Sequence, residues 1–373
     1  MNADGRKALL KLDPRLDRLD DKGKKLRDGL SAVVQVENTL WVAGDETTRL
    51  ERLVRIGNGD EKEAYDRHEA FALSAYFDLP AQEKEEADIE GLEVSDGYLW
   101  LVGSHSLKRG RPKAGESADA HRKSLLAKPK TDGNRFLLAR IPLVRHDDTF
   151  TLAKETDVGG RKRVAARLRG DAKGSDLTAA LGSDKHLGPF LSIPGKDNGF
   201  DIEGLCVAGE RVFVGLRGPV LRGWATVLEL AVRPDPGSPS VFGLQEIGPG
   251  GQRYRKHFLD LGGLGVRDLC VDGPDLLILA GPTMDLDGPV AIFRWPNGAR
   301  PSEESVVFAQ DIEKLVEVPF GIRVDHAEGM TLHRAEGRQG LSVLVLYDAP
   351  SESRKESRPG ETNVRADIFR LDR

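Results

Sequence analysis

The stretch Asp201-Ile202-Glu203-Gly204-Leu205-Cys206-Val207 decides the fold, because similar stretches recur along the chain. Asp88-Ile89-Glu90-Gly91-Leu92-Glu93-Val94 is a second copy, and His326-Ala327-Glu328-Gly329-Met330-Thr331-Leu332 is a third. A degenerate fourth copy runs from Gly265 to Val271, and a fainter fifth runs from Leu30 to Val34. Repetition of this kind indicates a fold built from copies of one structural unit.

Each copy belongs to a longer unit of apolar runs separated by polar turns. The unit around Asp201 is the clearest, with runs at Glu203 to Val207, Val212 to Leu216, Ala225 to Val232 and Phe258 to Leu261. Four strands per repeat are typical of a propeller blade. Five copies therefore predict an all-β fold, a five-bladed β-propeller of four-stranded blades.

The repeats place the whole chain, residues 1–373, in one propeller domain. The blades are expected at about 30–80, 88–194, 201–262, 265–310 and 326–373. In the first, second and fourth units the outer strands are expected at Phe77 to Leu79, Phe190 to Ile193 and Val306 to Ala309. The last unit lacks a fourth strand, so we expect Leu9 to Asp13 to supply it and close the ring, which removes an open sheet edge. Six blades, with the extra one in Arg161 to Gly188, are the alternative.

Three segments between these runs carry their own local signals. The composition of Glu61 to Ala75 resembles that of a helix, and Asp176 to Leu181 reads as a short helix with Ser175 as its N-cap. The polar, Lys/Arg/Gly/Pro-rich stretch from Leu107 to Asn134 predicts a mobile loop.

Composition excludes several classes of function. The chain is 39% hydrophobic and 31% charged, with a formal net charge of −5, so neither nucleic-acid binding nor membrane association is indicated. No apolar run is long enough for a membrane helix, and no signal-peptide pattern follows Met1, so the cytoplasm is the expected location. The two cysteines, Cys206 and Cys270, occupy equivalent repeat positions and are expected to be buried and reduced.

The innermost strand of each blade begins at one mouth of the central channel, so equivalent residues of the five copies form a ring there. Alignment of the copies places on this ring Ser31, Glu90, Glu203, Arg267 and Glu328. Converging carboxylates raise one another's pKa and require a neutralising cation. One interpretation is a divalent cation such as Ca²⁺ held by Glu90, Glu203 and Glu328. The other is an ionic hub in which Arg267 supplies the positive charge.

Further ionisable residues are expected beside this ring, at the same mouth. The candidates for acid-base or anion-binding roles are His105, His326 and Arg217, and the neighbouring carboxylates are Asp88, Asp201, Asp268 and Asp348. His105 leaves the second strand of its blade and leads into the polar loop. An aspartate before a Glu-Gly strand can equally serve to cap a turn.

The third unit resembles a bacterial family known as domain of unknown function 3616. The resemblance rests on Phe200-Asp201-Ile202-Glu203-Gly204-Leu205 and on the run from Gly215 to Ala225, and it extends over most of the chain. It implies a soluble bacterial propeller with no assigned reaction. A weaker resemblance is to calcium-activated nucleotidases, the apyrases, and it implies an axial Ca²⁺ bound by Ser31, Glu90, Glu203 and Glu328. Arg267 departs from that pattern, because it stands where an oxygen ligand would be.

Two classes of function remain open. One is a metal-dependent hydrolase of a phosphate-containing or other anionic small substrate, with Arg217 or Arg267 stabilising developing charge. The other is a non-catalytic propeller that binds a small anionic ligand or a protein partner at the channel mouth, with a structural Glu/Arg ring. The sequence predicts neither the substrate nor the oligomeric state.

Overall fold

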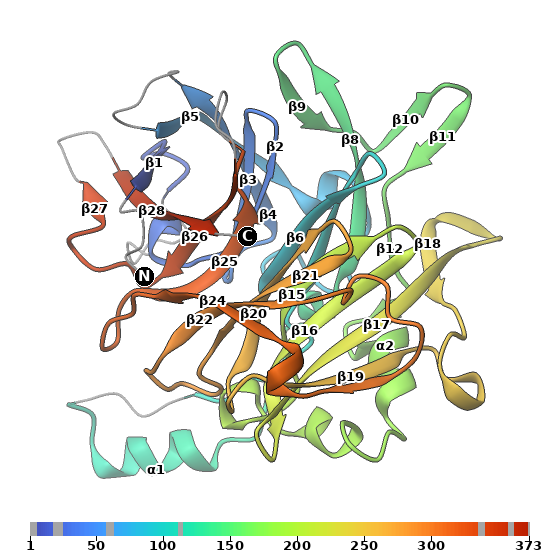
Figure 1. Cartoon of the computed structure of the whole chain (residues 1–373), viewed down its shortest axis with the longest axis vertical. Coiled ribbons are helices and arrows are strands. Elements are labelled where there is room, and N and C mark those ends of the chain that lie inside the picture. Colours follow the sequence, from blue (N-terminus) through green and yellow to red (C-terminus); the bar gives the residue numbers. More distant parts are fainter. Residues whose placement is uncertain are drawn as a thin grey trace.

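The protein is described by a computed structural model that covers residues 6–17, 25–56, 63–110, 115–334, 340–356 and 362–371. Five antiparallel four-stranded blades surround a central axis (Figure 1). The strands of the first blade, from the axis outward, are β2 (Leu30–Val36), β3 (Thr39–Gly44), β4 (Arg49–Ile56) and β5 (Glu63–Ala72). Those of the second are β6 (Ile89–Ser95), β7 (Tyr98–Gly103), β8 (Leu138–His146) and β12 (Ala166–Leu168).

The remaining three blades follow the same order. The third comprises β15 (Asp201–Ala208), β16 (Arg211–Leu221), β17 (Trp224–Asp235) and β19 (Arg255–Asp260). The fourth comprises β20 (Gly265–Asp272), β21 (Asp275–Gly281), β22 (Val290–Trp295) and β24 (Glu313–Val318). The fifth comprises β25 (His326–Leu332), β26 (Leu341–Asp348), β28 (Thr362–Leu371) and β1 (Arg6–Leu12).

The ring is closed by the amino-terminal strand, as predicted. β1 pairs antiparallel with β28, from Arg6 opposite Ile368 to Leu12 opposite Thr362, and it also pairs in parallel with β5 of the first blade. Around the axis, the five inner strands contact one another in the order β2, β6, β15, β20 and β25, and β25 contacts β2 again. The fold is therefore a five-bladed β-propeller.

The stretch considered for a sixth blade instead completes the second. Within Arg161 to Gly188 lie β11 (Arg161–Val164), which pairs with β10 (Glu155–Val158), then β12, the two-residue strands β13 (Gly170–Asp171) and β14 (Gly174–Ser175), and α2 (Asp176–Leu181). Ser175 caps α2, because its side chain accepts a hydrogen bond from the backbone N–H of Thr178.

Three expected outer strands are wrong. The chain is irregular at Phe77 to Leu79, and Phe190 lies in a 3₁₀ helix, Gly188–Ser192. Val306 lies in β23 (Ser305–Val307), which pairs in parallel with β19 of the third blade. The apolar side chains of Phe77 and Phe190 pack against core clusters without placing their backbone in a sheet. The true outer strands in these blades are β5, β12 and β24.

Two other local predictions also differ from the structure. The part of Glu61 to Ala75 that the structure describes is mainly the outer strand β5, followed by the 3₁₀ turn Leu73–Ala75, because pairing with β4 overrides helix-like composition. The described part of Leu107 to Asn134 contains α1 (Ala118–Leu126), which lies apart from the blades (Figure 1). Two further strands, β9 (Thr149–Leu152) and β18 (Ser238–Leu244), extend the sheets at the periphery.

The hydrophobic core lies between adjacent blades. Trp41 of the first blade belongs to the same buried cluster as Leu92 and Leu99 of the second. Cys206 and Cys270 are both free thiols, 0% and 6% exposed, so their predicted burial is confirmed. In the described ranges no helix is long and apolar enough to cross a membrane.

Candidate functional site

Every inner strand has a β-bulge at its predicted ring residue. In β6, for example, Ile89 pairs with Gly103 and Gly91 with Val102, so Glu90 has no cross-strand partner. The pairing registers shift in the same way around the other four ring residues, Ser31, Glu203, Arg267 and Glu328. A bulge re-aims a side chain away from the ladder. The bulges therefore explain how all five inner strands can present a side chain at the start of the channel.

The glycine that follows the ring glutamate is required by contact with the next blade. A Cβ atom on Gly91 would lie 2.5 Å from the Cβ of Leu205, and one on Gly204 would lie 3.1 Å from the Cα of Asp268. Only a residue without a side chain allows the inner strands to approach this closely. In the repeated Glu-Gly pair, the glutamate side chain thus points toward the channel, and the glycine backbone contacts the neighbouring blade.

Glu203, Arg267 and Arg217 form a buried ionic cluster at the ring. Arg267 Nη1 lies 2.9 Å from Glu203 Oε2 and 3.0 Å from Glu328 Oε1, and its Nη2 donates to the carbonyl of Pro282 at 3.1 Å. The other oxygen of Glu203 lies 2.5 Å from Arg217 Nη1, and Arg217 also pairs with Asp201. The side chains of Arg217, Glu203 and Arg267 are at most 10% exposed. Both arginines are therefore already bound to carboxylates.

Glu90 differs from the other two ring glutamates. It is 9% exposed, and the described part of the chain offers its carboxyl neither a hydrogen bond nor an ion pair. Burial raises the pKa of Glu90 well above the usual value, and the negative charges of Asp88, Glu203 and Glu328 raise it further. The raised pKa favours the protonated form of Glu90, which can donate a hydrogen bond. The fifth ring residue, Ser31, is satisfied, because its hydroxyl donates to the carbonyl of Ile89 at 2.6 Å.

A second ionic group lies beside Glu90 and centres on Arg135. Arg135 Nη1 lies 2.6 Å from Asp88 Oδ2 and donates to Ser106 Oγ at 3.0 Å, and Nη2 donates to Glu86 at 3.2 Å. Arg135 precedes β8 in the 3₁₀ turn Gly133–Phe136, outside any repeated phrase. The sequence analysis missed it, and no repeat or spacing in the sequence marks it.

His105 is buried and neutral. Its Nδ1 lies 3.0 Å from the carbonyl of Gly103, its ring contacts Phe136 edge-on, and burial lowers its pKa to about 4. With Nδ1 as the donor, Nε2 is an acceptor, and no partner for it exists in the described ranges. The hydroxyls of Ser104 and Ser106 bond to each other and face Arg135. The structure thus brings His105 near the predicted face but pairs it with no nucleophile.

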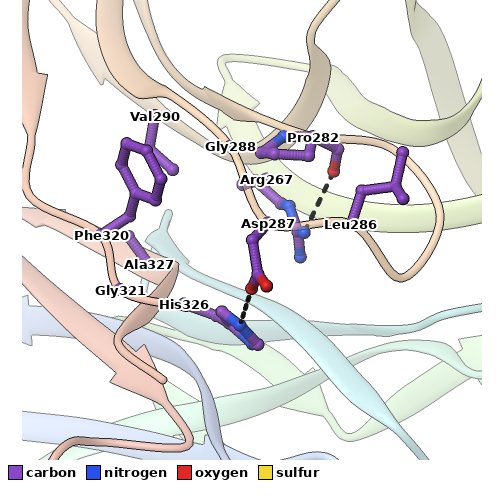
Figure 2. A pocket seen from close by; sticks show the side chains of 10 residues that line it. All are labelled: Arg267, Pro282, Leu286, Asp287, Gly288, Val290, Phe320, Gly321, His326 and Ala327. Atoms are coloured by element: carbon purple, nitrogen blue, oxygen red, sulfur yellow. Dashed lines mark hydrogen bonds and ion pairs between the residues drawn. The ribbon is translucent and has the colours of Figure 1, made fainter. Parts of the chain in front are cut away.

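His326 and Arg267 meet at a small crevice between the fourth and fifth blades (Figure 2). His326 Nε2 lies 3.1 Å from Asp287 Oδ1, and Nδ1 lies 3.8 Å from Asp348 Oδ2. The nearby carboxylate of Asp348 raises the pKa of His326, and the hydrogen bond to Asp287 adds to the effect. The crevice has a volume of about 10 Å³, enough for a single water molecule.

Asp268 does not lie at the channel mouth, which corrects its predicted placement. It occupies the position of the Glu-Gly glycine, and its carboxylate accepts hydrogen bonds from the backbone N–H of Leu269 at 2.8 Å and of Met330 at 2.7 Å. Asp268 is 1% exposed, and its pKa is raised well above the usual value by burial. It links β20 to β25 instead of facing a ligand.

The ring does not suit a calcium ion. The carboxylates of Glu203 and Glu328 are ion-paired to guanidinium groups, and a cation on the axis would be repelled by Arg217 and Arg267. Within the described ranges no three His, Cys, Asp or Glu side chains are grouped so as to hold a metal. The arrangement instead matches the ionic hub, to which Arg217 contributes a second cation.

The fold and this ring define the class of protein: a five-bladed β-propeller with a charged axial hub. The chain belongs to the family described as protein of unknown function (DUF3616), whose model matches residues 29–367. The curated proteins include no match.

Several solved structures show a distant likeness. Glutaminyl cyclase from Myxococcus xanthus is 9% identical with a TM-score of 0.36, over 98% of this chain and 100% of that one. Xyloglucan PUL GH43B from Bacteroides ovatus is 9% identical with a TM-score of 0.35, over 92% and 53% of the two chains. The Nup133 β-propeller domain from Vanderwaltozyma polyspora is 11% identical with a TM-score of 0.32, over 91% and 71%. These likenesses are too weak to carry an argument about function.

Proposed function

We propose that this protein is a non-catalytic binding propeller, in which the Glu/Arg ring is a structural hub and the channel mouth receives a polar small molecule. The observation that carries the proposal is the pairing of both ring arginines. Arg267 and Arg217 each contact two carboxylates, so neither is free to stabilise a developing negative charge. His105 contacts no hydroxyl or thiol among the described residues, so the structure does not favour a hydrolase with a serine or cysteine nucleophile either.

The charges of the mouth favour a neutral or cationic ligand over the anionic one expected from the sequence. An anion would have to displace Asp201, Glu203 or Glu328 from the arginines. Arg135 is likewise held by Asp88 and Glu86. Glu90 is the ring carboxyl without a hydrogen bond or ion pair in the described ranges, so we assign it the first contact with the ligand. A protonated carboxyl can donate to a ligand oxygen and accept from a ligand N–H or O–H.

A protein partner at the mouth is a second candidate, and exposed apolar side chains support it. Leu286 is 55% exposed, Phe320 is 44% exposed and Ile322 is 73% exposed, and the first two line the crevice beside His326. Clustered exposed apolar side chains mark interaction sites more often than isolated ones do. Loss of binding in Ile322→Asp and retention in Glu90→Gln would favour this candidate over the small-molecule site.

The proposal is tested by melting the protein in EDTA and in millimolar Ca²⁺ and by assaying nucleotide hydrolysis. We expect no calcium-dependent shift and no hydrolysis. Arg267→Met should cost about 3–5 kcal/mol, because it leaves Glu203 and Glu328 buried with less compensation. The matched control is Arg145→Met, which removes an exposed partner of Glu37 and should cost at most about 1 kcal/mol. A calcium-dependent rise in melting temperature that Glu90→Gln and Glu203→Gln abolish would favour the metal-dependent hydrolase.

A further inference from the structure

The opposite end of the central channel contains a cavity of about 420 Å³. All five inner strands contribute to its wall through residues that follow the ring along each strand, so it lies beyond the ionic hub from the mouth. Its size falls within the range of small-molecule sites, roughly 300–1,000 Å³. This cavity and the mouth are separate sites, and the inference below does not rest on the function proposed for the mouth.

Apolar residues and polar groups line this channel cavity in similar measure, and one carboxyl lies among its inner groups. The apolar residues are Val33, Val34, Val36, Leu92, Val94, Val207, Leu269, Val271, Met330 and Leu332. Glu93 on β6 is half-buried and lines the cavity, and its Oε1 accepts a hydrogen bond from the backbone N–H of Val94 at 2.8 Å. The charged residues Glu37 and Arg334 also line the cavity, but both are exposed.

Among the residues that the structure describes, no cation compensates Glu93. In the described ranges neither an ion pair nor a basic side chain acts on it. Asp268 and the thiols of Cys206 and Cys270 are close enough to interact electrostatically with Glu93. The basic side chain that lines the cavity, Arg334, is exposed. Backbone N–H groups of Val94 and Val207 bond to the Glu93 carboxyl, but a buried carboxylate that no cation neutralises is still costly. A ligand that supplies the missing positive charge lowers that cost.

We propose that the channel cavity binds a small, largely apolar amine, whose ammonium group pairs with Glu93. The apolar residues of the wall enclose the hydrocarbon part, and the single inner carboxyl fixes the orientation. The combination of apolar lining residues with a placed polar group is typical of small-molecule sites.

The pH dependence of binding follows from the state of Glu93. Burial raises the pKa of Glu93 to about 8, so at neutral pH the carboxyl is mainly protonated and an ammonium ion must displace that proton. The affinity for an amine should therefore rise on the order of tenfold per pH unit below this pKa. A neutral molecule of the same shape has no such dependence.

The experiment compares cyclohexylamine with cyclohexanol by isothermal titration calorimetry from pH 6 to pH 9. We expect the amine to bind at least tenfold more tightly than the alcohol at pH 8, and its affinity to rise with pH while that of the alcohol stays constant. Glu93→Gln should reduce the affinity for the amine at least tenfold and leave that for the alcohol within twofold. Glu37→Gln, the same substitution at the exposed rim, should leave both unchanged.

Thiol labelling supplies a readout in the unmutated protein. Cys270 lines the cavity, whereas Cys206 does not and is 0% exposed. Cyclohexylamine should slow the modification of Cys270 by a small uncharged reagent and leave that of Cys206 unchanged. Equal affinity for the amine and the alcohol would overturn the proposal. So would unchanged amine binding in Glu93→Gln, or the absence of Cys270 protection at saturating amine.

Discussion

Closure of the ring by β1 makes a quantitative prediction. Ala8, Leu10 and Leu12 of this strand are buried, at 0%, 0% and 4% exposure, in a cluster with residues of the first and fifth blades. Burial of a leucine contributes about 1.5–3 kcal/mol and of a methyl group about 0.8 kcal/mol, so the strand contributes about 4–7 kcal/mol through apolar burial. Native stabilities are about 5–15 kcal/mol. Deletion of residues 1–14 should therefore remove a large part of the stability and expose the edges of β28 and β5.

The deletion variant is expected to aggregate or to self-associate through its open edges. Urea unfolding and size-exclusion chromatography with light scattering measure the two effects. A peptide of residues 1–14 added in trans should restore the monomer by pairing with β28. A deletion variant that remains monomeric with an unchanged melting temperature would refute the assigned closure.

A point substitution tests the same interface with a matched control. Leu10→Ala should destabilise the protein by about 2–5 kcal/mol, because Leu10 is fully buried. The adjacent Lys11→Ala removes only a partly exposed pair with Asp66 at 3.5 Å, so its cost should be at most about 1 kcal/mol. Similar costs for the two variants would contradict the core position of β1.

Three further predictions concern ionisable groups. Because the pKa of Glu90 is raised in the folded state, its favourable contribution is complete below the unfolded pKa and is lost as pH rises through the folded pKa. Glu90→Gln should therefore flatten the dependence of stability on pH and gain on the parent protein as pH rises through the folded pKa, which urea unfolding at several pH values measures. The pKa of His326 is also raised, so NMR titration should place it above 6.5. The stability that its pairing contributes should decline as pH rises through the folded pKa. Asp287→Asn should lower the pKa of His326. Burial raises the pKa of both Cys206 and Cys270, so a charged thiol reagent should modify them slowly in the folded protein, and rapid modification of both would contradict their packing.

The inner strands could be predicted from the sequence because their residues must fit both the strand and its surroundings, which are the channel, the next blade or the core. In the copy around Glu203, the ring residue points to the channel, Gly204 contacts the next blade, and Leu205 enters the core. Repetition of these constraints produces repetition of the residues. It also explains the degenerate copy, where Asp268 replaces the glycine and bonds to Met330 instead of leaving space.

The outer strands of the first, second and fourth blades and Arg135 could not be predicted, for the opposite reason. An outer strand such as β5 buries few of its side chains, so its partly or fully exposed positions accept charged residues such as Glu63, Arg67 and Glu69 as readily as apolar ones. Arg135 reaches the mouth from a turn before β8, and its contacts with Asp88 and Glu86 exist only once the blade is folded. Neither feature leaves a local pattern in the sequence.

The unequal residues of the ring follow from its charge balance. Five equivalent glutamates would bring five carboxylates together, which no buried site tolerates without cations. Here Ser31 contributes no charge, Arg267 contributes one cation, and Arg217 adds a second from β16. Glu203 and Glu328 pair with these two arginines, but Arg217 also pairs with Asp201, so the carboxylates of the cluster outnumber its cations. The excess negative charge adds to burial in raising the pKa of Glu90. Because the raised pKa favours the neutral form of Glu90, this carboxyl lessens the need for a divalent ion and stays available at the mouth for contact with a ligand.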